Sequence, residues 1–345
     1  MSTKVLIRTP NHLGDCLMAL PMISEAREAY PGASITVLVP ENLAELFEFN
    51  PGIDDIITIP TSHVHGLLAV VKIKDLISPG KFDIGYILPP SFGAAASFKL
   101  AGVKERVGYI ADGRRLLLTR PLPLPTPLNS AHRSTLYFDL LRRGAGIDME
   151  YVRPKLFLND ADVERGSGML TDYGIIEDDE YAAVAFQAVA ESRRWGTANY
   201  IDLIKYLIAN YGLKIALIGT EDDRRVGDEI AEAAGTSEVK NLAGKTSIRE
   251  AAAVMSRARL FVGNDSGPAH LAAAVGIPIV VLSGADDPKS TSPMAAEKRL
   301  FYLDGLDCIS CVKNKCPLKG EQRMQCMTGI SLDMVSAEID RLFSY

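Results

Sequence analysis

Residues 260–282 read LFVGNDSGPAHLAAAVGIPIVVL, and this stretch indicates how the chain folds. The apolar runs at its two ends, Leu260–Val262 and Ile279–Leu282, have the length of buried strands. Between them, Pro268–Val275 has the length of a short helix with proline at its start. A strand, a helix and a second strand in this order form a βαβ unit, in which the two strands run parallel.

Segments of these two kinds alternate from one end of the chain to the other. Further strands are expected at Lys4–Arg8, Ser34–Val39, Ile56–Ile59, Phe82–Leu88, Tyr181–Phe186 and Lys214–Ile218. Helices are expected at Gly14–Tyr30, Glu41–Phe49, Ala131–Arg143, Ala198–Tyr211, Asp222–Ala234 and Ser247–Arg257, and Asn159 is expected to cap a helix that runs to Tyr173. The alternation predicts an α/β protein built from parallel sheets.

The length of 345 residues suits two such domains. A proline-rich connector, PLPLPTPLNS at residues 121–130, interrupts the first half, and a second series of strands and helices begins at Tyr181. We predict an N-terminal domain over residues 1–165 and a C-terminal domain over residues 166–345, with the last helix free to pack back on the N-terminal domain. Parallel sheets bind ligands beyond the carboxyl ends of their strands, so the loops after the strands hold the candidate site residues.

The net charge of −6 argues against general binding of nucleic acid, which needs a basic surface. The charge is uneven, because residues 99–143 carry nine basic and three acidic side chains. Such an excess is typical of a surface for an anionic partner, and equally of a solvated face. Apolar runs such as Leu67–Val71 are far shorter than the roughly 20 residues that span a bilayer, and we expect no signal peptide before the first strand. We therefore expect a cytoplasmic protein.

Asp15 follows the first strand and starts a helix, within the sequence NHLGD at residues 11–15. A carboxylate at this place is suited to accept a proton from a hydroxyl group. The residue also suits a plain helix start, because acids favour the first turn. Gly14 allows the backbone to approach closely, and His12 is a second, weaker candidate for the base.

Asp265, Ser266 and Gly267 lie between the strand and the helix of the βαβ unit at 260–282. Backbone N–H groups at a helix N-terminus bind anions such as a diphosphate, and Asp265 is suited to hold a sugar hydroxyl. His270, one turn into the helix, is placed to face the same anion. Capping of the helix by Asp265 or Ser266, with a packed His270, explains the same residues.

Two more loops carry charged residues after strands of the second half. Arg193 and Arg194 are suited to neutralise a departing diphosphate, or they form an ordinary surface pair beside Trp195. After the next strand, Glu221 or Asp222 is suited to bind ribose hydroxyls or to cap the following helix.

Four cysteines cluster near the C-terminus, at Cys308, Cys311, Cys316 and Cys326. Only the first pair has the spacing of a zinc site, so reduced thiols are favoured over structural zinc. The chain lacks the glycine fingerprint of dinucleotide-binding oxidoreductases and the P-loop motif. Its only D-x-D motif, at residues 160–162, lies at the expected domain border, which leaves cations and helix N-termini to hold a diphosphate.

Several motifs, taken in order along the chain, resemble glycosyltransferase family 9, the lipopolysaccharide heptosyltransferases. They are Asn11–Asp15, Arg106–Tyr109 with Arg114 and Arg115, Arg193–Trp195, Asn241–Thr246 and, as the strongest, Asn264–Pro278. The cysteine cluster also resembles that of the heptosyltransferase II members of the family.

The resemblance implies a GT-B fold, in which two Rossmann-like domains face a central cleft, and an inverting transfer of L-glycero-D-manno-heptose from ADP-heptose to the anionic lipid A core of lipopolysaccharide. Asp15 is the implied general base. The implied donor-binding residues are Arg193, Arg194, Glu221, Asp222, Asp265, Ser266, Gly267, Pro268 and His270. The implied acceptor-binding residues are His12, Gly14, Arg106, Arg114, Arg115 and Arg120. No cofactor is required, and the basic excess at 99–143 is expected to face the acceptor and the inner membrane surface.

The chain departs from the family pattern at two places. Arg193 stands where the family usually carries a lysine, which keeps the charge and changes a point charge into a fork. Phe186–Ala190 replaces the small-residue turn after the first strand of the C-terminal domain. Transfer of a different sugar and nucleotide-sugar binding without catalysis are the alternative functions, and the absent glycine fingerprint argues against an NAD-linked dehydrogenase.

Overall fold

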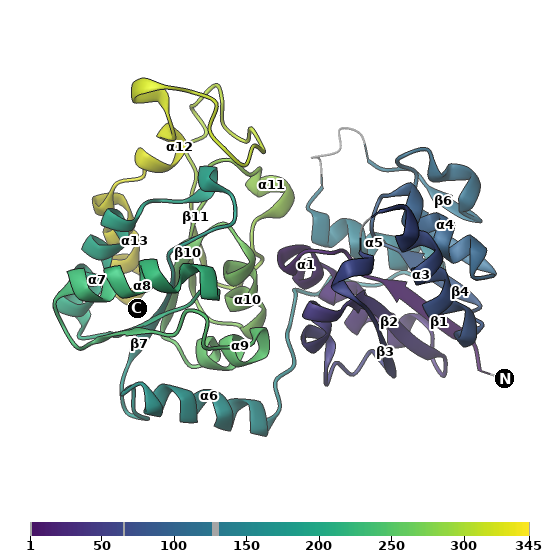
Figure 1. Cartoon of the computed structure of the whole chain (residues 1–345), viewed down its shortest axis with the longest axis horizontal. Coiled ribbons are helices and arrows are strands. Elements are labelled where there is room, and N and C mark those ends of the chain that lie inside the picture. Colours follow the sequence, from purple (N-terminus) through teal and green to yellow (C-terminus); the bar gives the residue numbers. More distant parts are fainter. Residues whose placement is uncertain (1, 65, 126–130, 345) are drawn as a thin grey trace. The chain divides into compact units, whose positions relative to one another are not determined.

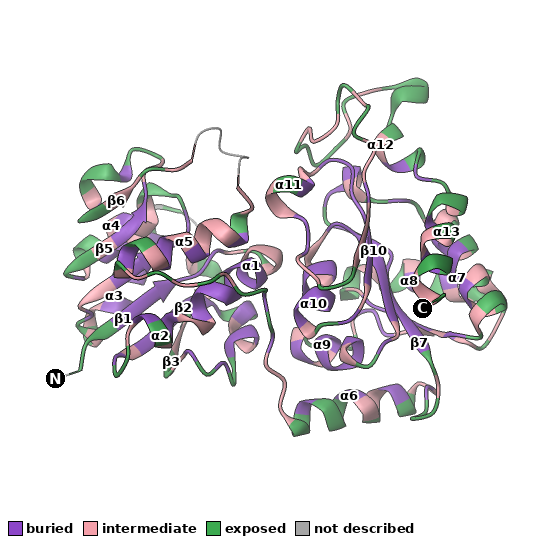
Figure 2. Ribbon diagram, turned by 180° about the vertical axis from the view of Figure 1, so that it is seen from behind, coloured by how far each residue is buried: buried purple, intermediate pink, exposed green. Residues whose placement is uncertain are grey.

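The computed structural model describes residues 2–64, 66–125 and 131–344, and residue contacts divide the chain into two units, Met1–Phe157 and Leu158–Tyr345. Each unit contains one six-stranded sheet whose neighbouring strands are parallel (Figure 1). The prediction of an α/β protein with parallel sheets is thereby confirmed. Figure 2 shows the strands labelled β1, β2, β7 and β10 in the colour of buried residues.

The first sheet has the strand order β3-β2-β1-β4-β5-β6. Its strands are β1 (Lys4–Arg8), β2 (Ser34–Pro40), β3 (Asp55–Ile59), β4 (Ile84–Ile87), β5 (Glu105–Tyr109) and β6 (Arg120–Leu122). The α-helices are α1 (Leu13–Ser24), α2 (Ala26–Ala29), α3 (Leu67–Ile77), α4 (Phe92–Leu100) and α5 (Arg133–Ala145). The strand order reverses between β1 and β4, and parallel sheets bind ligands at such a switch point.

Helices α3 and α4 pack on one face of the first sheet. Their side chains Ala69, Ile73 and Phe98 form a buried cluster with Leu6 and Leu38 of the strands. Successive strand residues point to opposite faces, so each strand also buries apolar residues on the other face. Helices α1 and α5 pack against each other outside this cluster and supply the second layer.

The second sheet has the strand order β12-β11-β10-β7-β8-β9, with its switch point between β7 and β10. Its strands are β7 (Tyr181–Ala185), β8 (Lys214–Leu217), β9 (Val239–Asn241), β10 (Leu260–Asn264), β11 (Ile279–Leu282) and β12 (Lys298–Phe301). Its α-helices are α6 (Asp160–Asp172), α7 (Thr197–Tyr211), α8 (Arg224–Ala234), α9 (Ile248–Ser256), α10 (Gly267–Val275), α11 (Pro288–Thr291), α12 (Gln325–Thr328) and α13 (Leu332–Phe343).

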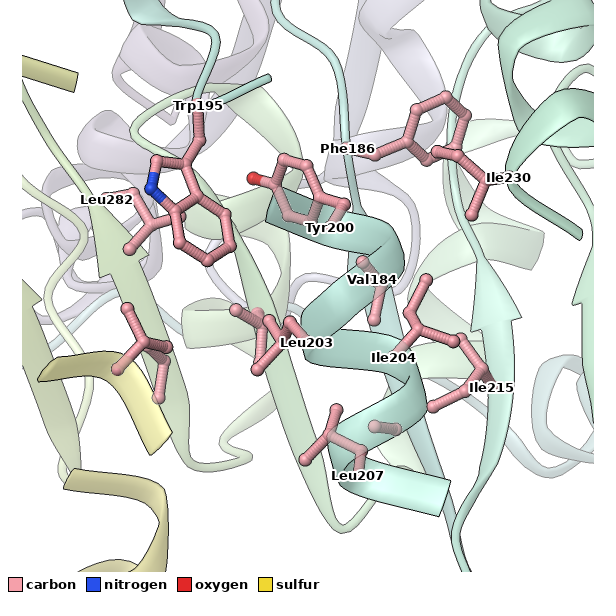
Figure 3. Close-up of a cluster of buried hydrophobic side chains, with 14 of the residues drawn as sticks. Val184, Phe186, Trp195, Tyr200, Leu203, Ile204, Leu207, Ile215, Ile230 and Leu282 are labelled. Atoms are coloured by element: carbon pink, nitrogen blue, oxygen red, sulfur yellow. The ribbon is translucent and has the colours of Figure 1, made fainter. Parts of the chain in front are cut away.

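Helices α7, α8 and α13 lie on one face of the second sheet, and α9 and α10 lie on the other (Figures 1 and 2). The core under α7 is built around Trp195, which packs edge-on against Tyr200 with ring centroids 5.2 Å apart (Figure 3). Trp195 Nε1 donates a hydrogen bond to the carbonyl of Ile330 at 2.7 Å. Val335 and Ile339 of α13 join the same core, so the apolar side of this last helix is buried within the second unit.

Trp195→Phe is expected to lower the free energy of unfolding by about 1–3 kcal/mol, because the buried carbonyl of Ile330 loses its donor. Urea titration followed by circular dichroism measures the change. Tyr206→Phe is the matched control, because it removes a hydroxyl that donates to Asp340 at the surface. That control should change stability by no more than about 0.5 kcal/mol, and an equally small effect of Trp195→Phe would contradict the role of its N–H group.

Helix α6 belongs wholly to the second unit, so the boundary expected at 165/166 falls inside a helix rather than between the units. Asn159 caps α6 as predicted, in a capping box with Asp162. Asp162 also forms a buried ion pair with Arg249 of α9, 2.5 Å long. One acid of the D-x-D motif, Asp162, therefore joins α6 to α9 through this ion pair.

The predicted helix Gly14–Tyr30 is divided at Glu25 into α1, which runs through Pro21 to Ser24, and α2. The helix expected at Glu41–Phe49 is a run of 3₁₀ turns over Glu41–Phe47. The proline-rich connector at 121–130 begins as the edge strand β6, and its residues 126–130 lie outside the described residues. Among the described residues, no helix has both the length and the apolar character needed to cross a membrane.

Candidate active site

The loop after β1 presents Asp15 at the switch point of the first sheet. Arg8, the last residue of β1, is buried, and its guanidinium donates to the carbonyl of Thr9 at 2.6 Å and to Asn11 Oδ1 at 2.5 Å. Burial lowers the pKa of Arg8 to about 10, which leaves it charged at neutral pH. These bonds hold the loop that enters α1, whose first turn contains Asp15.

Asp15 is paired with Arg133, a residue that the sequence analysis did not single out. Arg133 Nη1 donates to Asp15 Oδ1 at 2.7 Å, and the Asp15 side chain is 18% exposed. Arg133 is the first residue of α5, where a cation opposes the helix dipole. That unfavourable position is a signal by which an anionic neighbour could have been inferred from the sequence. His12 is the N-cap of α1 and Gly14 lies in its first turn with Asp15, and their contacts with the acceptor stay predictions.

Arg106 and Arg120 were predicted to bind the acceptor. They lie at the amino ends of the strands of the first sheet, away from the carboxyl ends that present Asp15. Each is near the amino end of its strand, β5 or β6. Arg106 donates to the carbonyls of Leu117 at 2.7 Å and Val103 at 2.5 Å, and Arg120 donates to the carbonyl of Gly144. Because ligands bind beyond the carboxyl ends, the position of these two arginines argues against the predicted acceptor contacts.

Arg114 is buried, and its guanidinium donates to the carbonyls of Tyr109 at 2.9 Å, Ile87 at 3.3 Å and Pro89. These carbonyls lie at or just beyond the carboxyl ends of β4 and β5, which the arginine holds together. The burial excludes the direct contact with an acceptor that we predicted for Arg114. Arg115, its neighbour in the 3₁₀ turn η4 (Arg114–Leu117), is exposed, and its contact with the acceptor stays a prediction.

In the second unit, the loops after β7 and β10 are joined at the switch point. Asn264 Oδ1 at the end of β10 accepts a hydrogen bond from the backbone N–H of Trp195 at 3.0 Å. Arg193 lies two residues earlier, in the 3₁₀ turn η6 (Glu191–Arg193). The same turn is held on its other side, where the N–H of Ser192 bonds to the carbonyl of Asn314 at 3.2 Å. Arg193 is therefore carried by a turn that is fixed from two directions.

Arg193 and Asp265 belong to one cluster of charged groups. Arg193 pairs with Asp286 through two nitrogens, with Nη2 2.7 Å from Oδ1 and Nε 2.6 Å from Oδ2. Asp265 is buried and accepts a hydrogen bond from the Ser283 hydroxyl at 2.8 Å. Burial raises the pKa of Asp265 to about 7, Asp286 adds to the rise, and Arg193 and Lys298 oppose it. Asp265 can therefore carry a proton near neutral pH and donate to a ligand oxygen.

Asp265→Asn is expected to flatten the dependence of stability on pH. The folded pKa of Asp265 lies above its unfolded value, so the folded state holds the proton more tightly and is less stable once the group ionises. This contribution is complete below about pH 4 and is lost as the pH rises towards about 7. Urea titrations at about pH 5 and about pH 8 measure it. The wild type should lose more stability between them than Asp265→Asn, whereas the exposed control Asp202→Asn should behave as the wild type. Equal losses would show that Asp265 is ionised throughout.

The N-terminus of α10 offers two unbonded amides. The N–H groups of Ala269 and His270 bond to the carbonyl of Ser266, at 3.0 Å and 3.4 Å, and Pro268 has no N–H. Within the described residues, the N–H groups of Ser266 and Gly267 reach no acceptor and no side chain caps the helix. Free amides at a helix N-terminus are an anion site, so the diphosphate interpretation of this loop fits better than simple capping.

The helix-capping role that the sequence left open between Glu221 and Asp222 is filled instead by a capping box of Thr220 and Asp223. Asp223 Oδ2 accepts hydrogen bonds from the N–H and the hydroxyl of Thr220, both at 2.8 Å. Glu221 and Asp222 are exposed beyond the carboxyl end of β8. A Cβ at Gly244, whose φ is +72°, would overlap the Glu221 carboxylate, so this glycine lets the loop after β9 approach that side chain.

A family model described as Glycosyltransferase family 9 (heptosyltransferase) matches residues 70–321, which is most of the chain. The chain belongs to glycosyltransferase family 9. This family 9 enzyme is 28% identical over 314 residues to lipopolysaccharide heptosyltransferase 2 of Escherichia coli (strain K12), an alignment that covers 87% of this chain and 88% of that protein.

Two solved structures share the fold of this family 9 glycosyltransferase over nearly its whole length. One is E. coli ADP-heptose lps heptosyltransferase II, with a TM-score of 0.80, 24% identity, and coverage of 99% of this chain and 98% of that one. The other is the glycosyl transferase family 9 protein from Veillonella parvula DSM 2008, with a TM-score of 0.85, 21% identity, and coverage of 99% and 97%. The predicted GT-B fold is confirmed.

The loop Phe186–Ala190, where this family 9 enzyme departs from the family pattern, is stabilised by a buried side chain and by a hydrogen bond from Arg194. Phe186 is buried and Val189 is fully exposed. Arg194 Nε donates to the carbonyl of Ala188 at 2.8 Å, so Arg194 supports the loop while its side chain remains exposed. Its predicted contact with the donor stays a prediction.

All four C-terminal cysteines of the family 9 enzyme are free thiols. Cys316 Sγ accepts a hydrogen bond from the N–H of Met324 at 3.4 Å. Burial raises the pKa of Cys326, and Cys308, Cys311 and Cys316 raise it further. In the described part of the chain, no three His, Cys, Asp or Glu side chains are arranged to hold a metal ion. That these cysteines are reduced thiols rather than ligands of a structural zinc ion stays a prediction.

Proposed function

We propose that this glycosyltransferase transfers a heptose from ADP-heptose to a hydroxyl group of an anionic lipopolysaccharide core. The names of its relatives, lipopolysaccharide heptosyltransferase 2 and ADP-heptose lps heptosyltransferase II, support this choice of donor and acceptor. The observation that carries the proposal is that each switch point supplies a different part of the chemistry. The first offers the carboxylate of Asp15, and the second offers Arg193 together with two free amides.

The second unit is proposed to hold the donor. The N–H groups of Ser266 and Gly267 bind the diphosphate at the positive end of α10, and Arg193 neutralises its charge. The buried Asp265 bonds to a hydroxyl of the sugar. Asp223 takes part in capping the helix, so Glu221 or Asp222 is available to bind the ribose of the donor. Cations and amides of the protein thus supply the charge that a metal ion supplies in other transferases.

The transfer is proposed to be a single displacement with inversion. The acceptor oxygen attacks the anomeric carbon while the bond between that carbon and the diphosphate oxygen breaks. The acceptor proton passes to the carboxylate of Asp15, and the electron pair of the broken bond leaves with ADP. Arg193 and the amides of α10 stabilise the charge that grows on the diphosphate. Water must be excluded during this step, because hydrolysis of the donor competes with transfer.

The direct test is incubation of the purified protein with ADP-heptose and a truncated core acceptor, followed by mass spectrometry of the products. One heptose added to the acceptor, with release of ADP, is the expected result. A thermal-shift series with ADP, UDP and GDP tests the nucleotide separately, because a ligand that binds the folded state raises its melting temperature. Stabilisation by UDP or GDP but not by ADP would overturn the donor, and binding without turnover would favour a non-catalytic sugar-nucleotide binding protein.

Arg133→Gln is expected to lower kcat by roughly 10- to 10²-fold with a smaller change in KM, because the Asp15 carboxylate loses the group that orients it. Arg133→Lys should recover part of the rate, since an ammonium can still pair with the carboxylate. Arg143→Gln is the matched control, because it removes a pair with Asp139 in the last turns of the same helix. Equal rates for Arg133→Gln and the control would remove Arg133 from the site.

The acceptor is expected to contact the first unit through the surroundings of Asp15, including His12, Gly14 and Arg115. A lipid-anchored acceptor also places the enzyme at a membrane surface. We propose peripheral attachment to the cytoplasmic face of the inner membrane, driven by basic residues of the 99–143 segment.

A further inference from the structure

Helices α3 and α4 lie side by side on one face of the first sheet (Figures 1 and 2). Their inward side chains fill the core, and their outward sides carry large apolar residues. Leu68 and Val71 of α3 and Phe92 and Leu100 of α4 are each at least 50% exposed, and Leu116 of the adjoining turn η4 is 87% exposed. Exposed apolar side chains that gather on adjoining elements mark a contact surface.

The same outward sides carry exposed lysines. Lys72 lies one turn after Leu68 on α3, and Lys99 precedes Leu100 on α4. Of the two acids nearby, Asp75 is paired with Lys74 at 2.9 Å, and Asp112 accepts the N–H of Phe92 at 2.9 Å, a bond that leaves its negative charge in place. The two exposed lysines are interleaved with the apolar side chains. We call the set Leu68, Val71, Lys72, Phe92, Lys99 and Leu100 the α3–α4 surface.

One end of the α3–α4 surface lies beside the carboxyl ends of the strands of the first sheet, the side that presents Asp15. Helix α4 starts at Phe92, shortly after the carboxyl end of β4. A Cβ added to Gly93 would lie 3.4 Å from Val70 Cγ2, so the first turns of α3 and α4 touch. Leu68 and Phe92 consequently stand beside the carboxyl ends of the strands, the edge from which an acceptor would enter.

We propose that the α3–α4 surface docks this enzyme on the anionic face of a lipid bilayer. Its apolar side chains enter the boundary between headgroups and acyl chains, while Lys72 and Lys99 pair with lipid phosphates. Charge favours a bilayer over a second copy of the chain, because a two-fold contact through this surface brings lysines towards lysines. The orientation relative to the acceptor rests on the proposed function, whereas the binding to lipid does not.

Co-sedimentation of the full-length protein with vesicles tests the proposal, in the absence of donor and acceptor. The wild type should bind vesicles of phosphatidylcholine mixed with phosphatidylglycerol, and bind weakly to phosphatidylcholine alone. Lys72→Gln/Lys99→Gln should weaken binding to the anionic vesicles by roughly 25-fold, since each lysine near an anionic surface contributes about fivefold. Leu68→Ser/Leu100→Ser should weaken it by at least about tenfold.

Matched substitutions in the second unit serve as controls. Lys205→Gln/Lys319→Gln removes two exposed lysines, and Val163→Ser/Ile176→Ser removes two exposed apolar side chains. Both controls should bind vesicles as the wild type does. No binding of the wild type to anionic vesicles, or binding retained by both surface variants, would overturn the proposal. A dimer in sedimentation equilibrium that Leu68→Ser/Leu100→Ser dissociates would overturn it in favour of a second copy.

A soluble, de-acylated acceptor separates this proposal from the proposed function. On that acceptor the α3–α4 variants should turn over at the wild-type rate, because none of the four substituted residues is placed in the site. If the wild type binds anionic vesicles but transfers no heptose to either acceptor, the proposed function fails and the docking surface stands. If it transfers heptose but ignores vesicles, the docking surface fails alone.

Discussion

Asp15→Asn is expected to reduce kcat by about 10²–10⁴-fold while ADP-heptose binds with nearly its original strength. The amide has almost the same shape as the carboxylate and can still contact Arg133, but it cannot accept the proton of the acceptor hydroxyl. The donor is proposed to bind to the second unit, so its affinity should not depend on this side chain. Initial rates of ADP release measure kcat, and calorimetric titration with ADP measures donor-site binding.

Asp112→Asn is the matched control for Asp15→Asn. Asp112 is an exposed acid of the same unit with a φ of +46°, a conformation that asparagine tolerates well. It should retain the wild-type rate. Near-normal turnover by Asp15→Asn would show that another group, with His12 the nearest candidate, accepts the proton.

Arg193→Met is expected to reduce kcat by about 10²–10³-fold, the size of effect seen when one preorganised group that stabilises transition-state charge is removed. The negative charge on the departing diphosphate grows as the sugar bond breaks, so a fixed cation matters more in the transition state than in the bound donor. KM should change less than kcat. Arg193→Lys should stay within about tenfold of the wild type, because it keeps the charge and loses only the two-pronged geometry.

The interpretation of Arg193→Met depends on its partner Asp286, whose side chain is only 13% exposed. Losing the arginine removes the cation that faces this largely buried carboxylate, and Arg193→Met/Asp286→Asn removes the negative charge as well without restoring a cation. The double variant should therefore regain stability in urea titration and remain slow. Arg323→Met, which removes the exposed partner of Glu191 in the same turn, is the control. A fast double variant would mean that the single substitution acts through misfolding rather than through lost charge stabilisation.

The sequence predicted the fold where local pattern and tertiary burial agree. In the stretch 260–282 the apolar runs became β10 and β11, and the helix between them starts one residue before the predicted Pro268. Asn159 was recognisable because a capping box satisfies backbone N–H groups with side chains only three residues apart. Signals of this kind are contained within one turn of chain and need no knowledge of the rest of the molecule.

Elements without such local patterns escaped prediction. Strand β12 reads KRLF and β9 reads VKN, and edge strands need few apolar residues because one side meets solvent. Helix α4 reads FGAAASFKL, whose small residues show no apolar period. These segments take their conformation from the sheet against which they pack, and that sheet cannot be inferred from the segments themselves.

The same limit explains the outcome for the candidate site. Asp15 was found because it lies within a short motif after a strand, but its partner Arg133 is 118 positions away along the chain. Arg114 and Arg115 are adjacent and chemically identical, yet one is buried under carbonyl groups and the other is exposed. Which of two neighbouring side chains turns inward depends on the packing of η4, which residue type alone does not encode.

The single indole of this chain gives the enzyme a built-in optical reporter. The backbone N–H of Trp195 bonds to the side chain of Asn264, which lies one residue from Asp265 and three from the free amide of Gly267. Emission from that one ring should therefore respond when a nucleotide occupies the loop. Rapid-mixing fluorescence could then follow donor arrival in real time, on unlabelled protein and with no second tryptophan to obscure the signal.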